Sequence, residues 1–167
     1  MAPENLKLPL SVVSNGDVMR IRREINQLDE YISQMALRKP GTPPKHLPRL
    51  STSLNDFAEI NKLNFLNNTD RSSALKFFQN LLDKGPIVHI SFASEPSESF
   101  IRKITAWFRD NTTPLVMINI GLEPSIAAGC TLRTENHFHD FSLREHFKEQ
   151  RSLLLNGIRE PAVPKHE

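Results

Sequence analysis

A proline-rich segment near the N-terminus is the feature that most restricts how this chain folds. The stretch KPGTPPKHLP, residues 39–48, carries four prolines and one glycine. Proline fixes φ and lacks a backbone N–H, so this stretch excludes helix and favours an extended, stiff connection. We therefore predict an N-terminal helical segment over 1–38, a linker over 39–50, a folded domain over 51–160 and a tail over 161–167.

Ahead of the linker, apolar residues recur at alternating spacings of three and four, which places them on one narrow stripe of a helix over 16–38. Asn15 and Asp17 are the predicted caps, and Pro40 ends the helix because the residue before proline leaves the helical region. The stripe packs either on the protein's own body or on a helix of another chain. We favour the second interpretation, because the stripe is narrow and lies beyond a stiff spacer. The predicted partner-binding residues are Val18, Ile21, Ile25, Leu28, Ile32 and Met35.

The segment after the linker alternates helix and strand patterns. Amphipathic stripes and caps predict four helices, whereas short apolar runs rich in β-branched residues predict strands. The resulting order is α-α-β-α-β-β-α, which indicates an α+β fold: a small sheet of two to four short strands covered by helices, preceded by a projecting N-terminal helix. The predicted helices cover 53–65, 69–84, 98–109 and 142–158, and the strands cover 87–93, 115–122 and 129–141, the last with a bend at 135–136.

Two of these helices carry more detailed predictions. In the last helix, Ser142 and Glu145 form a capping box, in which each side chain bonds the other residue's backbone N–H. The helix over 98–109 carries three aromatic residues, which are expected to face the protein's interior. Its predicted buried stripe is Phe100 or Ile101, Ile104, Trp107 and Phe108, and its predicted solvated basic face is Arg102, Lys103 and Arg109.

Charge and cysteine content exclude several classes of protein. Lys plus Arg number 21 against 19 for Asp plus Glu, a formal charge of +2, so the composition does not indicate nucleic-acid binding. A single cysteine cannot form an intrachain disulfide, and no apolar leader follows the start, so a reducing cytoplasm is favoured. The longest apolar runs fall short of the roughly 20 residues of a membrane-spanning helix, so membrane association would be indirect, through partners.

The stretch SIAAGCTLRTENHFHDFSLREHF, residues 125–147, contains the residue types that catalysis uses. Cys130 with His137 or His139 as base would suit a thiol nucleophile, and the same histidines with Asp140 and His146 would suit a metal. Neither arrangement has the third orienting group or second ligand pair that would make it specific, and phosphate-binding glycine motifs are absent. We predict no catalytic, cofactor-binding or metal-binding residues; a small metal-dependent or thiol-dependent enzyme stays as the minor alternative.

The same stretch resembles the C-terminal region of the delta subunit of F-type ATP synthases, the oligomycin-sensitivity-conferring subunit family. In that family an acidic turn, an apolar pair and a glycine lead into a strand ending in arginine, and a later aspartate-x-serine block opens the last helix. The resemblance is carried by Glu123, Ser125, Ile126, Ala127, Ala128, Gly129, Leu132 and Arg133, and then by Asp140, Ser142, Leu143 and Arg144. It is most specific over 114–156, and by order of elements it extends back to 86.

The resemblance implies a non-catalytic peripheral-stalk (stator) component without a cofactor, linking the catalytic head to the membrane-anchored stalk. Its implied partners are stalk helices and catalytic-head subunits, and its implied location is the cytoplasm, peripheral to the inner or cell membrane. Gly129 would permit tight strand entry, and Arg133, Asp140, Ser142, Arg144 and Glu145 would form the structural junction to the last helix. A stand-alone adaptor or binding module with a delta-like fold is the alternative.

Overall fold

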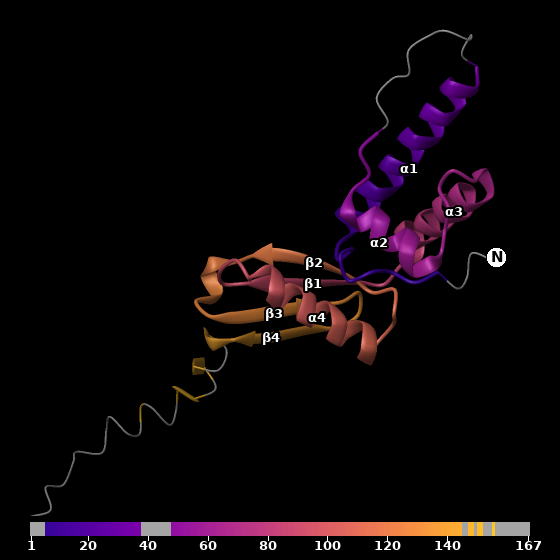
Figure 1. The fold of residues 1–167 in the computed structure, drawn as a ribbon. Helices are drawn as coiled ribbons and strands as arrows, with labels where there is room; N and C mark the ends of the chain where they lie inside the picture. The colour runs from indigo at the N-terminus through magenta and orange to yellow at the C-terminus, as the bar shows by residue number, and fades with distance from the viewer. Residues whose placement is uncertain (1–5, 38–47, 145–146, 149, 152–154, 156–167) are drawn as a thin grey trace, which may run out of the picture. The chain divides into compact units, whose positions relative to one another are not determined.

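The structure, a computed structural model, describes residues 6–37, 48–144, 147–148, 150–151 and 155. Within them the chain is α+β, which confirms the predicted fold class and order of elements. Figure 1 shows the order α1, α2, α3, β1, α4, β2, β3 and β4, with a 3₁₀ turn, Pro124–Ile126, between β2 and β3.

The first helix, α1, runs over Asn15–Ala36 and is capped by Ser14 rather than by Asn15 or Asp17. The Ser14 side chain accepts a bond from the Asp17 N–H at 3.2 Å, and the Asp17 carboxylate accepts one from the Ser14 N–H at 3.0 Å. Asp17 is therefore the third helical residue of a capping box, and the predicted cap was placed too late.

The next two helices also begin earlier than predicted. Helix α2, Thr52–Asn61, is capped by Ser51, and α3, Asn68–Lys84, is capped by Asn67; each cap side chain accepts a first-turn N–H. Helix α2 ends at Lys62, which has a left-handed φ of 52°, so the predicted continuation to Phe65 is wrong. Ile60 lies near this end and is exposed.

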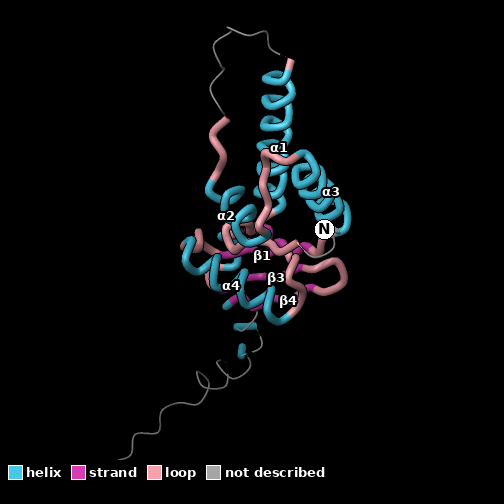
Figure 2. The backbone as a smooth tube through the Cα atoms, turned by 45° about the vertical axis from the view of Figure 1, so that its right-hand side comes forward, coloured by secondary structure: helices cyan, strands magenta, loops and turns pink. Residues whose placement is uncertain are grey.

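Helices α1, α2 and α3 enclose the main core. Figures 1 and 2 show α1 and α3 side by side. Three rings from α2 and α3 lie at its centre, with the Phe57 centroid 4.6 Å from that of Phe78 and 5.8 Å from that of Phe77. The buried Arg71 of α3 pairs with Asp29 of α1 at 2.7 Å, which ties the two helices together.

The sheet has four short strands in the order β2-β1-β3-β4, and Figure 1 shows this order. Strand β3 pairs antiparallel with both β1 and β4. The predicted third strand is thus a hairpin of two strands joined at the predicted bend, residues 135–136. The strands are β1, Ile87–Phe92; β2, Met117–Leu122; β3, Gly129–Arg133; and β4, Phe138–Ser142. Helix α4, Glu98–Asn111, connects β1 to β2.

The fold divides into two compact units that differ from the predicted domains. The helical unit comprises the described residues up to Val88 together with Ser97–Asn119, and the hairpin unit comprises His89–Pro96 and the described residues from Ile120 onward. The N-terminal helix therefore belongs to the same unit as α2, α3 and α4. The physical reason is that α3 supplies an apolar face against which α1 buries its own stripe.

Two predicted segments lie wholly or mostly outside the described residues. The linker is described only at residues 48–50, which have no regular structure. In the predicted last helix, residues 143–144, 147–148, 150–151 and 155 are helical, whereas Glu145 is outside the described residues. Ser142 itself is the last residue of β4, directly before this helical segment.

Candidate functional site

The predicted partner-binding stripe of α1 is largely part of the protein's own core. Val18, Ile21, Ile25 and Leu28 are buried, and Ile32 packs against the same cluster, whereas Met35 is exposed. The prediction that these side chains contact another chain is therefore wrong for the four buried residues. A three-four spacing shows that a stripe is buried, but not which chain buries it. Here α3 provides the opposing surface through Ala74, Phe77, Phe78 and Leu81.

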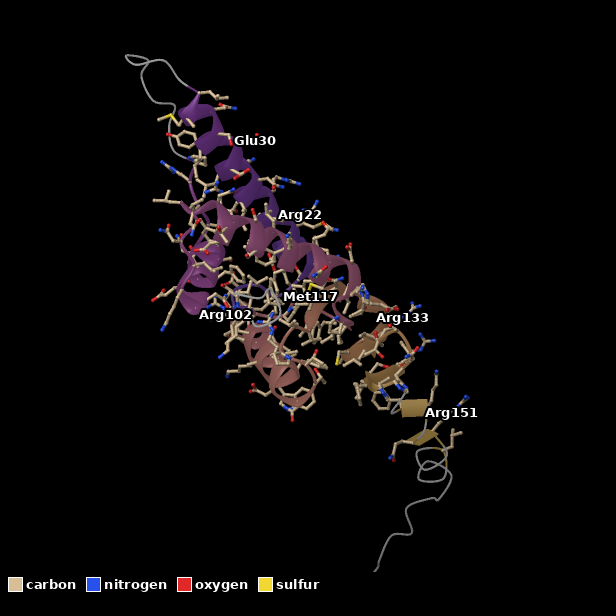
Figure 3. The ribbon with its side chains drawn as sticks, turned by 90° about the vertical axis from the view of Figure 1, so that its right-hand side faces the viewer. Arg22, Glu30, Arg102, Met117, Arg133 and Arg151 are labelled. Atoms are coloured by element: carbon tan, nitrogen blue, oxygen red, sulfur yellow. The ribbon has the colours of Figure 1, made fainter. Side chains whose placement is uncertain are left out.

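The solvent side of α1 also contacts α3. Arg22, labelled in Figure 3, donates to the Gln79 side chain of α3 at 2.6 Å. This exposed polar contact flanks the buried stripe, so α1 is held to α3 from two sides. The helix is consequently a poor candidate for a surface that engages a partner.

Gly129 begins β3 at a position that only glycine fits. Its φ is +93°, and a Cβ built there would lie 2.3 Å from the carbonyl oxygen of Phe141 on the neighbouring strand. In the hairpin register Gly129 is the partner of Ser142. A side chain would therefore meet rigid backbone as well as unfavourable φ. This geometry agrees with the tight strand entry expected from the resemblance.

Asp140 and Ser142 form the junction at the end of β4. The Asp140 carboxylate accepts a hydrogen bond from the Ser142 N–H at 2.8 Å. Hydrogen bonds from the Ser142 side chain, and then from its backbone N–H, lower the pKa of Asp140. Ser142 is buried, and the following Leu143 N–H donates to the Ala128 carbonyl at 2.8 Å. The hydrogen bonding of the hairpin thus extends one residue past β4, to Leu143.

The two arginines of the resemblance are exposed. Arg144 follows the junction, and its charge together with that of Lys148 further lowers the pKa of Asp140. Arg133 ends β3 and is labelled in Figure 3. In the register it lies opposite Phe138, which is also exposed. The functional roles of both arginines stay predictions, because the charge of Arg144 is the weakest of the causes that act on Asp140.

The thiol and imidazoles of the enzyme alternative lie in and beside the β3–β4 hairpin. Burial, and then the charge of Asp140, raise the pKa of the Cys130 thiol, which is opposite to what a nucleophile requires. The rings of His137 and His139 stack with centroids 6.2 Å apart on one face of the hairpin. Within the described residues no group of three or more metal-binding side chains comes together.

Arg109 of α4 is buried, which corrects the prediction that it lies on a solvated face. Its guanidinium donates to the backbone carbonyls of Pro9 at 2.8 Å, Leu8 at 3.4 Å and Val12. Burial lowers the pKa of Arg109 to about 10. The side chain thereby fastens the N-terminal segment to α4 within the helical unit. Nothing in the helical periodicity pointed to this role.

The opposite correction applies to Trp107, which was predicted as a core residue, and to Phe100, which was predicted as one in alternative to Ile101. Phe100 is 46% exposed and Trp107 is 58% exposed, whereas Thr105 and Phe108 are buried. Phe100, Ile104 and Trp107 follow each other at helical spacing, and we call them the α4 apolar strip. The apolar side of α4 is therefore wider than the part that the helical unit buries, which is typical of an interaction surface.

The helical unit also contains a cavity of about 360 Å³ at the C-terminal end of α3. Among the described residues that line it, Lys84 is charged; the others are Phe77, Asn80, Leu81, Gly85, Pro86 and Leu115. Met117, labelled in Figure 3, lies close to Gly85, since a Cβ on that glycine would be 2.8 Å from the methionine methyl group. The lining offers no pair of acid and base groups.

Comparisons with known protein families and with curated proteins find no match to this chain. Among the described helices, none combines the length and the apolar character needed to cross a bilayer.

Proposed function

We propose that this protein is a non-catalytic peripheral-stalk component of an F-type ATP synthase, linking the catalytic head to the membrane-anchored stalk. One observation carries the proposal. The two blocks of the delta-like pattern, separated in sequence, pair with each other across the β3–β4 hairpin, where Gly129 lies opposite Ser142. The glycine and the aspartate-x-serine block are thus parts of a single structural junction, as a shared architectural motif requires.

The exposed apolar side chains support a binding role. The α4 apolar strip presents side chains at i, i+4 and i+7, the spacing by which one helix docks against another. A second exposed apolar pair, Leu143 and Phe147, lies in the helical segment after β4. A part that joins two components needs two such surfaces. In this proposal the α4 apolar strip contacts a stalk helix, on the cytoplasmic side and peripheral to the membrane.

Affinity purification of the tagged chain from its native cell tests the proposal. The native chain is expected to bring down other ATP synthase subunits. Phe100→Ala with Trp107→Ala should abolish this association while lowering the melting temperature less than a core substitution would, because about half of each residue is exposed. Arg102→Ala is the matched control, since Arg102 is exposed on the same helix and forms an ion pair with Glu98 at 3.5 Å.

Three outcomes would contradict the proposal or a part of it. If the native chain brings down a defined complex without any synthase subunit, the function is that of a stand-alone adaptor with a delta-like fold. If synthase subunits associate equally with the double variant, the stalk is bound by a surface other than the α4 apolar strip. Hydrolytic activity that is lost on Cys130→Ala would instead favour the enzyme alternative.

A further inference from the structure

Strand β4 lies at one edge of the sheet, and the hydrogen bonds at its two ends show which of its backbone groups face outward. Strand β4 is the last strand of the sheet. Bonds from the Thr134 N–H to the His137 carbonyl and from the Leu143 N–H to the Ala128 carbonyl show which residues face β3. Because inward and outward residues alternate in an antiparallel ladder, His139 and Phe141 also direct their backbone groups toward β3. Phe138, Asp140 and Ser142 then direct theirs to the outer edge.

This outer edge is only partly blocked. The Ser142 N–H is taken by the Asp140 carboxylate at 2.8 Å. Within the described part of the chain, no backbone bond to Phe138 or Asp140 exists on this side. The opposite edge of the sheet is different, because the Ile118 N–H of β2 donates to the Val13 carbonyl at 2.9 Å. An uncovered edge is a template for another strand.

We propose that β4 pairs with β4 of a second copy of this chain, forming a two-fold symmetric antiparallel dimer. The proposal goes beyond the stalk function and does not rest on it. In the pairing, Phe138 of each copy lies opposite Asp140 of the other. The outward N–H and C=O groups of both residues then bond the backbone of the second copy. His139 of one copy then lies opposite His139 of the other, on the two-fold axis.

Charge and hydrogen bonding select this register over its neighbours. A shift that places Asp140 opposite Asp140 would oppose like charges and would ask the occupied Ser142 N–H to bond again. A shift that places Phe138 opposite Phe138 would pair Asp140 with residue 136, which lies in the bend rather than in the strand. Only the register centred on His139 avoids both conflicts.

The exposed rings of β4 fit this arrangement. His137, His139 and Phe141 stack in series on one face, with successive centroids 6.2 and 5.9 Å apart. Under the two-fold axis the row is antiparallel to its copy, so Phe141 meets His137 of the second copy. These are non-hydrogen-bonded pairs, in which side chains lie closest and aromatic partners stabilise a sheet. Phe141, 62% exposed in the single chain, would lose much of its contact with water.

A charge-swap experiment tests both the dimer and its register. Analytical ultracentrifugation of the full chain over a concentration series should show reversible dimerisation. His139→Glu and His139→Lys should each weaken it by about tenfold or more, because like charges meet on the axis. An equal mixture of the two variants should regain association as a heterodimer. His139 is exposed, so at concentrations where the native chain is monomeric the thermal melts of both variants should match that of the native protein.

The opposite results would overturn the proposal. A native chain that stays monomeric throughout the series excludes the dimer. Dimers that persist in both single variants place the interface elsewhere, and a mixture that associates no better than its components excludes the register centred on His139.

A disulfide scan provides an independent measurement in a Cys130→Ser background. His139→Cys places two thiols opposite each other in a pair with Cα atoms about 4.5 Å apart, within the span of a disulfide. Phe138→Cys is the matched control. In this register the two introduced cysteines are displaced by two residues along the strands, at a rise of roughly 3.4 Å per residue, so the distance between them exceeds the span of a disulfide. Mild oxidation should link the first variant and not the second. Equal or reversed linking would overturn the proposed register.

Discussion

The helical unit and the hairpin unit bury their apolar residues to very different extents. In the helical unit the α1 stripe is covered, with Val18 and Ile25 fully buried. In the hairpin unit, Phe138 and Phe141 of β4 are each more than 60% exposed. The most regular apolar pattern of the sequence, the α1 stripe, is therefore used inside the protein, whereas exposed apolar side chains lie on β4 and on the α4 apolar strip. Helical spacing does not by itself distinguish the covered stripe of α1 from the exposed strip of α4, so a partner surface has to be identified from exposure.

The largest effect is expected from Ile25→Asp in α1. The substitution places a carboxylate in a fully buried apolar site without a counter-ion, which should lower the free energy of unfolding by about 4 kcal/mol or more. Met19→Asp is the control, because Met19 is 51% exposed on the same helix, and it should cost less than about 0.5 kcal/mol. Chemical denaturation measures both. If the two variants are equally stable, the α1 stripe is not part of the core, and the interpretation that it binds a partner would be favoured again.

Arg109→Met should have the next largest effect, again in the helical unit. Methionine fills much of the volume but leaves the carbonyls of Pro9 and Val12 without their guanidinium donor. Unsatisfied buried acceptors predict a loss of about 3 kcal/mol. Hydrogen exchange should show early opening of residues 6–14. Arg102→Met, at an exposed position of α4, should change neither the free energy of unfolding nor the exchange of residues 6–14. A similar loss of stability in this control would mean that the positive charge on α4, and not the contacts with the carbonyls, stabilises the fold.

Gly129→Ala sharpens the comparison because its effect should stay within the hairpin unit. The new Cβ meets the Phe141 carbonyl and requires a positive φ, which predicts a cost of about 2–3 kcal/mol. Amide exchange should accelerate in β3 and β4, while α1 and α3 keep their protection. Gly16→Ala is the matched control, because a Cβ there would meet only the Ser14 hydroxyl at 3.5 Å. A loss of protection in α1 would show that the two units unfold together.

Much of the fold could be predicted from local patterns. The short strands were recognisable because β-branched runs bounded by glycine and proline exclude most alternatives. The bend at 135–136 was predicted as well, but the two strands of the hairpin were predicted as one strand. The turn contains no glycine that would have indicated a hairpin, because the Thr134 hydroxyl organises it by accepting a hydrogen bond from the His137 N–H. The observed caps are Ser14, Ser51 and Asn67, and each helix start was predicted slightly too late. The reason is that several polar residues near each helix start are suitable caps.

The surfaces were harder to predict, and Arg109 shows why. Its partners are carbonyls roughly a hundred residues away in the sequence, so no local pattern encodes them. An arginine on an amphipathic helix is usually solvated, and a tryptophan is usually buried, but in α4 these positions are exchanged. Gly129 and the Asp140–Ser142 junction could be anticipated only because their spacing resembled a known family. Residue type alone did not identify them.

The smallest effect concerns the carboxylate of Asp140, which is fully exposed and acts through one contact. Hydrogen bonds from Ser142 lower its folded-state pKa, so the contact contributes stability above the ordinary Asp range and loses it as the pH falls through the lowered value. Ser142→Ala removes the hydroxyl, the larger contributor, but keeps the backbone N–H. A carbon-detected NMR titration should therefore find the pKa of Asp140 raised only partway toward its ordinary range. Asp140→Asn, which keeps an oxygen acceptor for the Ser142 N–H, should leave neutral-pH stability almost unchanged and flatten its acid dependence. If Ser142→Ala leaves the titration of Asp140 unaltered, the positive charges of Lys148 and Arg144, rather than the serine, set its pKa.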